Sequence, residues 1–265
     1  MAAVSYNTFV KIAGDAIARM LAWPFPELRD LPPNHLCIRV GTGNRIFNGH
    51  LIFIRAGNEC WLTFLSRQYC TFKSDVTELG CGCGRIAGAL RDPPWDPWFK
   101  GTYVGVDIDS EMIEYCRSNF PEDRFQFILS PHRSATYSPS NSPYAQETPS
   151  KLIIADEQSK DFVYSLSLYS HLLETEAIEY MQESYRILRT NGIMFMTFFC
   201  IEHVELGGRW TFRQRRGNAY IEDARYPEAA VAYHEAFVID VAKKCGFREV
   251  TVAPKKGQSE LVALK

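Results

Sequence analysis

The first 70 residues place hydrophobic side chains at helical spacing. Between residues 4 and 22, such side chains are found at Val4, Phe9, Ile12, Ala13, Ile17, Met20 and Leu21. This spacing predicts an amphipathic helix, which Pro24 and Pro26 would end because proline cannot continue a helix. A second helix is predicted from about residue 50 to residue 68, with Leu51, Ile54, Trp61, Leu62 and Leu65 on its apolar face. Residues 1–70 are therefore expected to form a helical cap within one larger domain.

From Asp75 onward, short apolar runs alternate with amphipathic segments. The predicted strands are residues 75–80, 102–108, 124–129, 161–168 and 193–200, and the predicted helices are residues 83–91, 110–120 and 175–189. The turn pair Asn191-Gly192 is expected to end the last of these helices. A further helix is predicted over residues 228–245, with Gly246 just past its end. Two strands, residues 248–254 and 259–265, would then close the chain as an antiparallel hairpin.

This alternation predicts the fold class. Strands joined through helices form right-handed crossovers, and the sheet they build is parallel. We expect an α/β domain over residues 71–265, with a doubly wound, mostly parallel seven-stranded sheet and an antiparallel C-terminal hairpin. The Ser/Pro-rich residues 130–151 are predicted to be a loop. Aromatic and polar residues alternate around Gly217, so a second hairpin that could contact a substrate is predicted at residues 205–223.

Composition and charge exclude several classes of protein. The chain has 265 residues, a net charge of −2 and 46% hydrophobic residues, which suits a soluble domain and argues against a general nucleic-acid or anionic-membrane binder. No apolar run is long enough to span a bilayer. The N-terminal segment is interrupted by charges and does not read as a signal peptide. Most of the eight cysteines are scattered in apolar segments, which predicts reduced thiols and a cytoplasmic protein.

The strongest chemical signal is a glycine run between a predicted strand and a helix. It reads Glu78-Leu79-Gly80-Cys81-Gly82-Cys83-Gly84. Glycines let a backbone turn tightly and approach a ligand, and the helix that follows presents free N–H groups. A triphosphate loop would need lysine after Gly84, where Arg85 stands. A dinucleotide loop counted from Gly82 has the permitted Ala87 at its last position, so it stays open beside S-adenosylmethionine, whose methionine part is a zwitterion.

A carboxylate at the end of the next predicted strand narrows the choice of ligand. Asp107 ends the run Val104-Gly105-Val106-Asp107 and would lie beside the glycine run at the carboxyl edge of the sheet. A carboxylate in this position can accept hydrogen bonds from both hydroxyls of a ribose. Asp107 could equally be a turn or capping aspartate. Together with the glycine run, it favours an adenosine-containing cofactor.

These segments resemble a known family. The runs ELGCGCGR and YVGVDIDSEMI, followed by DFVYSLSLYSHL and RILRTNGIMFMTFF, are similar to the motifs of class I, Rossmann-like, S-adenosylmethionine-dependent methyltransferases. The resemblance runs from about Asp75 to Cys200. It implies an enzyme that binds S-adenosylmethionine and releases S-adenosylhomocysteine, and it is nearly silent about the methyl acceptor.

The resemblance also implies which residues bind the cofactor. Glu78, Gly80 and Gly82, with Cys81 between the glycines, would surround the methionine part. Asp107 would hold the ribose, and Ile108 and Met112 would flank the adenine. Family members often carry an acidic or amide residue just after the third strand, whereas this chain has Ser130, and either Ser130 or a backbone group is expected to take over the adenine contact.

The acceptor side is expected in the segments that follow the fourth and fifth strands. Methyl transfer is an in-line displacement, in which a base helps when the acceptor is a hydroxyl. His171 is the first candidate for this base, or for a group that orients the acceptor, and His203 is the second, although either could be structural. Tyr169 is a candidate substrate contact. Arg213 and Arg216 could clamp a carboxylate or phosphate on the acceptor, or could simply be solvated.

The overall prediction is a methyltransferase acting on a small-molecule or sugar-like acceptor, most simply at oxygen. Since no acidic cluster suggests a divalent ion, a metal-independent reaction is expected. Two alternatives come from other classes, namely an NAD(P)-dependent oxidoreductase with the same loop and a non-catalytic module that binds S-adenosylmethionine. The sequence predicts neither an oligomeric state nor a nucleic-acid or membrane partner.

Overall fold

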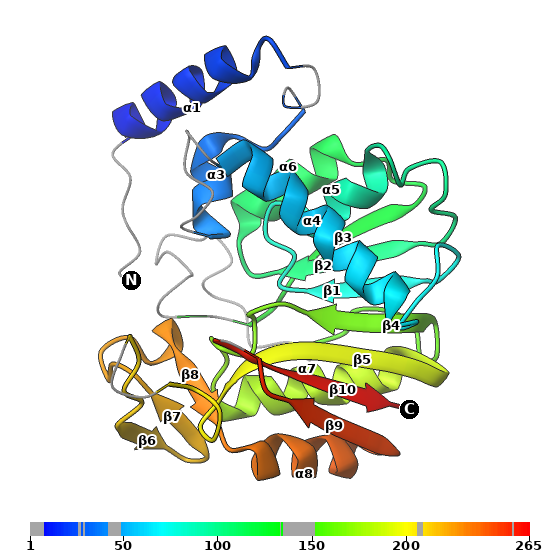
Figure 1. Cartoon of the computed structure of the whole chain (residues 1–265), viewed down its shortest axis with the longest axis vertical. Helices are drawn as coiled ribbons and strands as arrows, with labels where there is room; N and C mark the ends of the chain where they lie inside the picture. The colour runs from blue at the N-terminus through cyan, green and yellow to red at the C-terminus, as the bar shows by residue number, and fades with distance from the viewer. Residues whose placement is uncertain are drawn as a thin grey trace.

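The computed structural model describes residues 8–25, 28, 30–41, 49–132, 134, 152–205, 209–255 and 257–265. Seven strands form its centre in the order β3-β2-β1-β4-β5-β10-β9 (Figure 1). Their bounds are β1 Val76–Leu79, β2 Tyr103–Asp107, β3 Phe125–Leu129, β4 Lys160–Ser165, β5 Leu188–Cys200, β9 Glu249–Ala253 and β10 Ser259–Leu264. Strands β1 to β5 are parallel, and β10 and β9 are antiparallel. The predicted α/β fold class is confirmed.

The register of the parallel strands sets the edge where a ligand can bind. Leu79 at the end of β1 lies opposite Val106 of β2 and Ser165 of β4. The loops after these strands therefore leave the sheet together. In open α/β sheets this carboxyl edge holds the ligand crevice.

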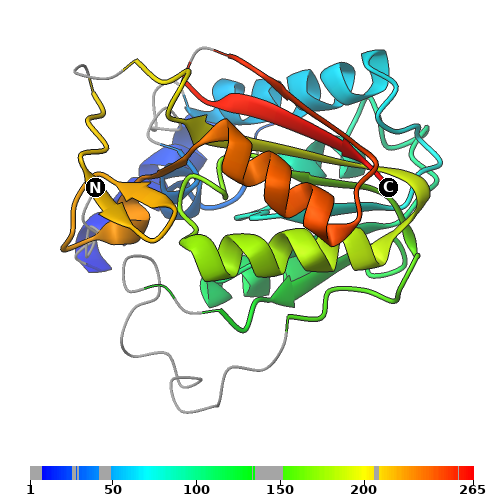
Figure 2. The same cartoon turned by 90° about the horizontal axis from the view of Figure 1, so that it is seen from below.

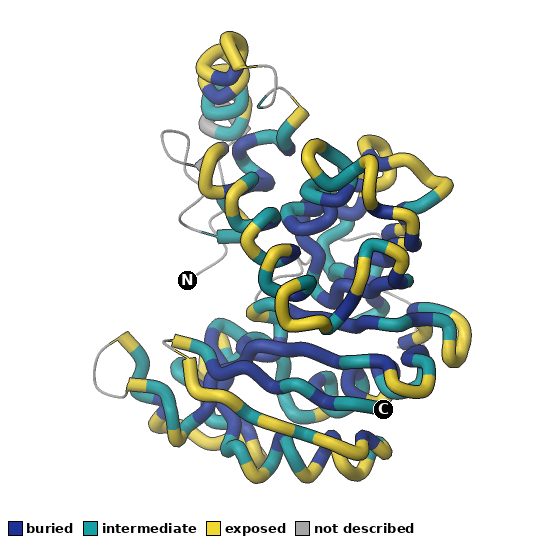
Figure 3. Tube along the Cα trace, turned by 45° about the vertical axis from the view of Figure 1, so that its right-hand side comes forward, coloured by how far each residue is buried: buried dark blue, intermediate teal, exposed yellow. Residues whose placement is uncertain are grey.

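Helices cover both faces of the sheet (Figures 1 and 2). One face carries α4 (Gly49–Ser66), α5 (Arg85–Arg91) and α6 (Ser110–Asn119), and the other carries α7 (Glu174–Ile187) and α8 (Glu235–Cys245). Side chains of β4 alternate between the two layers, since Phe162 and Tyr164 pack under α4 whereas Val163 packs with α7. Figure 3 shows the resulting buried band along the strands.

The N-terminal helices are α1 (Thr8–Ala22), α3 (Asn34–Arg39) and α4. Helix α3 forms directly after Pro33, in a segment for which the sequence pattern predicted no helix. Helix α4 lies close against α5, where a Cβ on Gly57 would come within 2.7 Å of the Arg85 carbonyl oxygen. The indole N–H of Trp61 donates to the carbonyl of Ile86 at 3.0 Å.

A three-stranded extension enlarges the sheet beyond the seven strands expected. It consists of β6 (Gln214–Arg216), β7 (Ala219–Ile221) and β8 (Val231–Tyr233), and β8 pairs with the end of β5. Strands β6 and β7 form a hairpin turning at Gly217 and Asn218. In Figure 2 the extension projects from one end of the sheet.

Two predicted helix boundaries were wrong. The helix predicted over residues 228–245 begins only at Glu235, because Val231, Ala232 and Tyr233 pair as a strand with β5 and β7. A 3₁₀ turn, η1 (Pro227–Ala229), precedes that strand. Strand β5 begins directly after α7, so the predicted turn at Asn191 lies inside it, at a positive φ of 66°.

Three further observations complete the fold. All eight cysteines are free thiols, as predicted. No helix among the described residues has the length and apolarity needed to cross a membrane. Most of the Ser/Pro-rich loop predicted at residues 130–151, and residues 206–208 of the predicted segment 205–223, lie outside the described residues.

Candidate functional site

The glycine run forms a left-handed turn at the carboxyl end of β1. Gly80, Gly82 and Gly84 have φ angles of 79°, 54° and 79°, which side chains with a Cβ rarely adopt. A Cβ on Gly82 would lie 2.3 Å from Cγ1 of Val40, and a Cβ on Gly80 would lie 3.2 Å from Cβ of Leu168. The turn is therefore a cradle with α3 on one side and the loop after β4 on the other.

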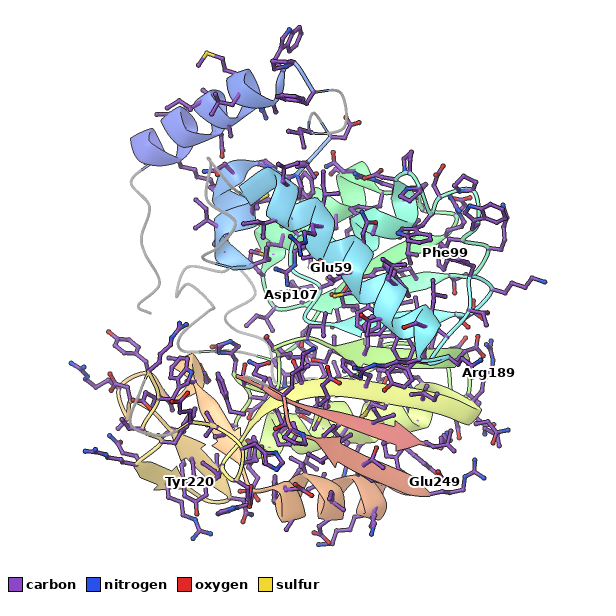
Figure 4. The ribbon with its side chains drawn as sticks, viewed as in Figure 1. Glu59, Phe99, Asp107, Arg189, Tyr220 and Glu249 are labelled. Carbon is purple, nitrogen blue, oxygen red and sulfur yellow. The ribbon has the colours of Figure 1, made fainter. Side chains whose placement is uncertain are left out.

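Asp107 lies beside this cradle at the end of β2 (Figure 4). Its Oδ2 accepts the N–H of Gly82 at 2.8 Å, and its Oδ1 accepts the N–H of Asp109 at 3.0 Å. Burial raises the pKa of the Asp107 carboxyl to about 6, although the hydrogen bond from Gly82 opposes the rise. The group is therefore mostly ionised at neutral pH. A carboxylate offers about four lone-pair positions, so it can still accept hydroxyl groups.

Glu78 points into the aromatic layer under α4. Its carboxylate accepts hydrogen bonds from the hydroxyls of Tyr103 and Tyr164, the latter at 3.0 Å. Burial raises its pKa to about 7, against the effect of these two hydroxyls. Cys81 is also directed inward, and its Sγ lies 2.9 Å from where a Cβ on Gly105 would be. For these two predicted cofactor residues, the side chains stabilise the loop and only the backbone faces the cradle.

The three residues predicted at the adenine have different environments. Ile108 is half-buried at the sheet edge. Met112 is 4% exposed and packs in a cluster with residues of α3, while its Sδ lies 3.7 Å from the Cβ position of Gly82. Ser130 is turned inward, where its hydroxyl pairs with that of Tyr180 at 2.9 Å and its N–H donates to the backbone carbonyl of Asp107.

The loop after β4 passes over the cradle and is held on both sides. Leu168 contacts Gly80, and the N–H of His171 closes a turn onto the carbonyl of Leu168 at 2.8 Å. The carbonyl of Ser170 accepts from Val231 of β8, and the Ser170 hydroxyl accepts from Gln258 at 3.0 Å. His171 is therefore fixed between the cradle and the extension.

The imidazole of His171 has a defined hydrogen bond. Its Nδ1 lies 2.9 Å from the carbonyl oxygen of Glu228, which can only accept, so Nδ1 carries the proton and Nε2 the lone pair. Burial lowers the pKa of this imidazole below its usual value. His171 is therefore neutral at pH 7, as a general base must be.

Tyr169 belongs to the core rather than to a surface. It is 2% exposed and packs among side chains of α7, α8 and β5, including Met181, Val238 and Phe198. Burial raises its pKa well above the usual value. The predicted substrate contact at Tyr169 is therefore corrected, because its ring lies inside the hydrophobic core.

His203 lies apart from the two predicted arginines. His203 follows β5 and contacts the Ser259 hydroxyl through Nδ1 at 2.9 Å. Arg213 and Arg216 are exposed on the extension. Burial opposes the ionisation of Glu222, but hydrogen bonds from Phe212 and Thr211 lower the pKa of its carboxyl. The charge of Arg213 lowers this pKa further.

The extension contains features that the sequence pattern did not indicate. A cavity of about 360 Å³ is lined by Trp210, Glu222, Asp223, Arg225, Tyr226, Ala229 and Ala230. Because Ala229 directly follows Glu228, this cavity begins one residue from the carbonyl that holds His171. In the sequence, the only feature that pointed toward this cavity was the aromatic and arginine content of the segment. A second feature, a group of Cys200, His203 and Glu235, forms where β5 and β8 end.

Comparisons with known proteins agree with this geometry. Residues 77–196 match the sequence model of a methyltransferase-domain family. A structure of an S-adenosylmethionine-dependent methyltransferase from Methanosarcina mazei is 17% identical, with a TM-score of 0.50 over 76% of this chain and 96% of that one. A protein from Pyrococcus horikoshii is 16% identical, with a TM-score of 0.51 over 86% and 97% of the two chains. At these identities the two structures establish a shared fold.

Proposed function

We propose that the chain is a class I S-adenosylmethionine-dependent methyltransferase, because residues 77–196 match a methyltransferase-domain model and the fold is shared with such an enzyme. We further propose that it methylates a hydroxyl group of a small, sugar-like molecule with His171 as general base. The observation that carries this proposal is the hydrogen bond between His171 and the carbonyl of Glu228. It selects the neutral tautomer with a basic Nε2, on a loop that also contacts the glycine cradle.

The residues at the carboxyl edge fit S-adenosylmethionine. Gly80 and Gly82 have the positive φ angles and close surroundings of a cradle that a Cβ would fill, and Asp107 places a buried carboxylate beside it. The backbone of the glycine run would hold the methionine part, and Asp107 would hold the ribose hydroxyls. Ile108 and Met112 would pack against the adenine. When bound, S-adenosylmethionine supplies a methyl group on a sulfonium, which is already activated for displacement.

The chain itself has to orient the acceptor and remove a proton. Nε2 of His171 would accept the proton of the acceptor hydroxyl, while the Nδ1–H bond to Glu228 keeps the ring in place. General-base catalysis of this kind contributes about 10²–10⁴-fold to a rate. Alignment of the acceptor by the surrounding loops contributes further. No step in this scheme requires a metal ion.

The cavity on the extension supports a sugar-like acceptor. It combines the aromatic side chains Trp210 and Tyr226 with the polar Asp223 and Arg225, and its volume falls in the range of small-molecule sites. Aromatic faces pack on the C–H face of a sugar, while carboxylates and guanidinium groups bind its hydroxyls. Arg213, close to Glu222 of this cavity, and Arg216 are candidate contacts for an anionic group on the acceptor.

The test is transfer of a labelled methyl group to a panel of sugars, sugar phosphates and simple amines. We expect hydroxyl-bearing sugars to be methylated and His171→Gln to lower kcat by at least about 100-fold. Affinity for S-adenosylhomocysteine should stay within twofold of wild type. His132→Gln, a half-buried histidine on the loop after β3 whose pKa burial also lowers, is the matched control. Transfer only to amines, or an unchanged kcat in His171→Gln, would refute the proposal.

The two arginines are tested separately. If they bind an anionic acceptor, Arg213→Ala and Arg216→Ala raise KM for a sugar phosphate without changing the affinity for the cofactor product. Unchanged kinetics would assign both side chains to the solvated surface. Arg225→Ala then reports on the cavity itself, since this side chain lines it.

A further inference from the structure

A thiol, an imidazole and a carboxylate meet where β5 ends and α8 begins. Strand β8 runs parallel to β5, with Cys200 opposite Tyr233, so both strands end at the same edge. The turn after β5, residues 200–203, therefore lies next to the first residues of α8. One potential ligand atom each from Cys200, His203 and Glu235 lies within 4.8 Å of the other two.

The spacing of these groups suits two ligands of one metal ion. Nε2 of His203 and Oε2 of Glu235 are 3.6 Å apart, which is longer than a hydrogen bond. Two nitrogen or oxygen ligands placed about 2.1 Å from a tetrahedral zinc ion are about 3.4 Å from each other. The observed separation is therefore close to that of two atoms sharing an ion.

The second nitrogen of His203 is held as in metal sites. Its Nδ1 lies 2.9 Å from the hydroxyl oxygen of the buried Ser259. When Nδ1 donates its proton to this oxygen, the lone pair of Nε2 points toward Glu235. Histidines that bind metals usually make such a hydrogen bond with the other ring nitrogen, because it fixes the tautomer and the ring orientation.

Glu202 lies outside this group of three residues and forms an outer layer, because it hydrogen-bonds to one of them. Its Oε2 accepts from the thiol of Cys200 at 3.0 Å, and its Oε1 lies 2.7 Å from Nδ1 of His234. His234 in turn contacts the hydroxyl of Tyr220 through Nε2 at 3.0 Å. Glu202 is thus placed to accept the thiol proton when Cys200 binds a metal, and the proton then passes to solvent.

We propose that Cys200, His203 and Glu235 bind a zinc ion, with water in the fourth position. A thiolate, an imidazole and a carboxylate form a donor set typical of zinc, and calcium or magnesium would prefer oxygen ligands alone. The side chains of His203 and Glu235 are 23% and 36% exposed, so water can reach the fourth position. This departs from the metal-free protein expected from the sequence, and it leaves the transfer step at His171 as described.

The proposal is tested on the full-length protein after removal of metals with a chelator. Zinc is titrated by calorimetry, and Co²⁺ is used as a spectroscopic probe of thiolate ligation. We expect stoichiometric zinc binding and a thiolate-to-cobalt charge-transfer band. Cys200→Ser should remove that band, and Glu202→Gln should weaken zinc binding by about 10–100-fold, as for other outer-layer partners.

Two further variants keep the test decisive. Cys245→Ser changes a thiol at the opposite end of α8 and should bind zinc and cobalt like wild type. Glu235→Gln changes a partly exposed side chain, so it tests the site even if Cys200→Ser does not fold, and it should lose most of the zinc affinity. Zinc binding that is absent from wild type, or equal in wild type and Glu235→Gln, would overturn the proposal.

Discussion

The carboxylate of Asp107 accepts the backbone N–H of Gly82, with Oδ2 and N separated by 2.8 Å. This bond joins the end of β2 to the glycine cradle after β1. It orients the carboxylate and shapes the cradle before any cofactor binds. The proposed ribose contact and the proposed methionine contact are therefore coupled through one hydrogen bond.

Asp107→Asn is expected to weaken binding of S-adenosylhomocysteine by roughly 10–100-fold. Hydrogen bonds to a charged group contribute about 1.5–3 kcal/mol, and the amide replaces one acceptor oxygen by a donor. Calorimetric titration measures the affinity. Asp123→Asn, an exposed aspartate after α6, is the control and should bind like wild type. Equal affinities for Asp107→Asn and wild type would assign Asp107 to the loop alone.

Gly82→Ala is expected to lower the free energy of unfolding by about 1–3 kcal/mol, because it combines a positive φ with crowding. The added Cβ would lie 2.3 Å from Cγ1 of Val40. Val40→Ala should recover the steric part, so the double variant should be more stable than the sum of the single effects predicts. Gly88→Ala is the control, since its Cβ meets nothing closer than 3.9 Å. If the free-energy effects of the two single variants simply add in the double variant, Val40 does not crowd Gly82.

Glu78 predicts a pH-dependent stability. Burial raises its pKa from 4.5 in the unfolded chain to about 7. Between these values the unfolded chain loses the proton while the folded protein keeps it, so the free energy of unfolding falls as the pH rises. The loss amounts to about 3 kcal/mol, complete above pH 7. In Glu78→Gln the decline should be smaller by this amount, and the remainder comes from Asp107, whose pKa burial also raises. Urea denaturation from pH 4.5 to 8 measures it, with Glu122→Gln as an exposed control; parallel curves for Glu78→Gln and wild type would contradict the assignment.

Glu111 of α6, which contacts the N-terminal helices α1 and α3, predicts that the free energy of unfolding changes with pH in the opposite direction. Burial opposes ionisation, yet hydrogen bonds from Lys11, His35 and Arg39 lower its pKa to about 2. This stabilisation is therefore present above pH 4.5, the unfolded value, and is lost as the pH falls toward 2. Because the side chain of Glu111 is 44% exposed, solvent and salt weaken this stabilisation. We expect Glu111→Gln to speed proteolysis within α1 at neutral pH. Glu114→Gln, on α6 like Glu111, should not change the cleavage rate. Equal cleavage rates for Glu111→Gln and wild type would show that these contacts do not hold α1.

The sequence predicted most of the central fold because local patterns decide it. Apolar runs of strand length between amphipathic segments imply a parallel sheet with helices on both faces. The extension was harder, since Val231, Ala232 and Tyr233 continue a helical pattern until β5 and β7 offer them hydrogen-bond partners. Tertiary pairing overrode local preference there.

Sequence alone determined the glycine run and the strand that brings Asp107 beside it, because both depend on neighbouring residues and on the common edge of parallel strands. Only the tertiary structure decided where the side chains point. The strand pleat turns Glu78 to Tyr103 and Tyr164, and the packing of the loop after β4 buries Tyr169. The pairing of β5 with β8 brings Cys200 to Glu235 across 35 positions of sequence, and a contact over such a separation leaves no periodic trace in the chain.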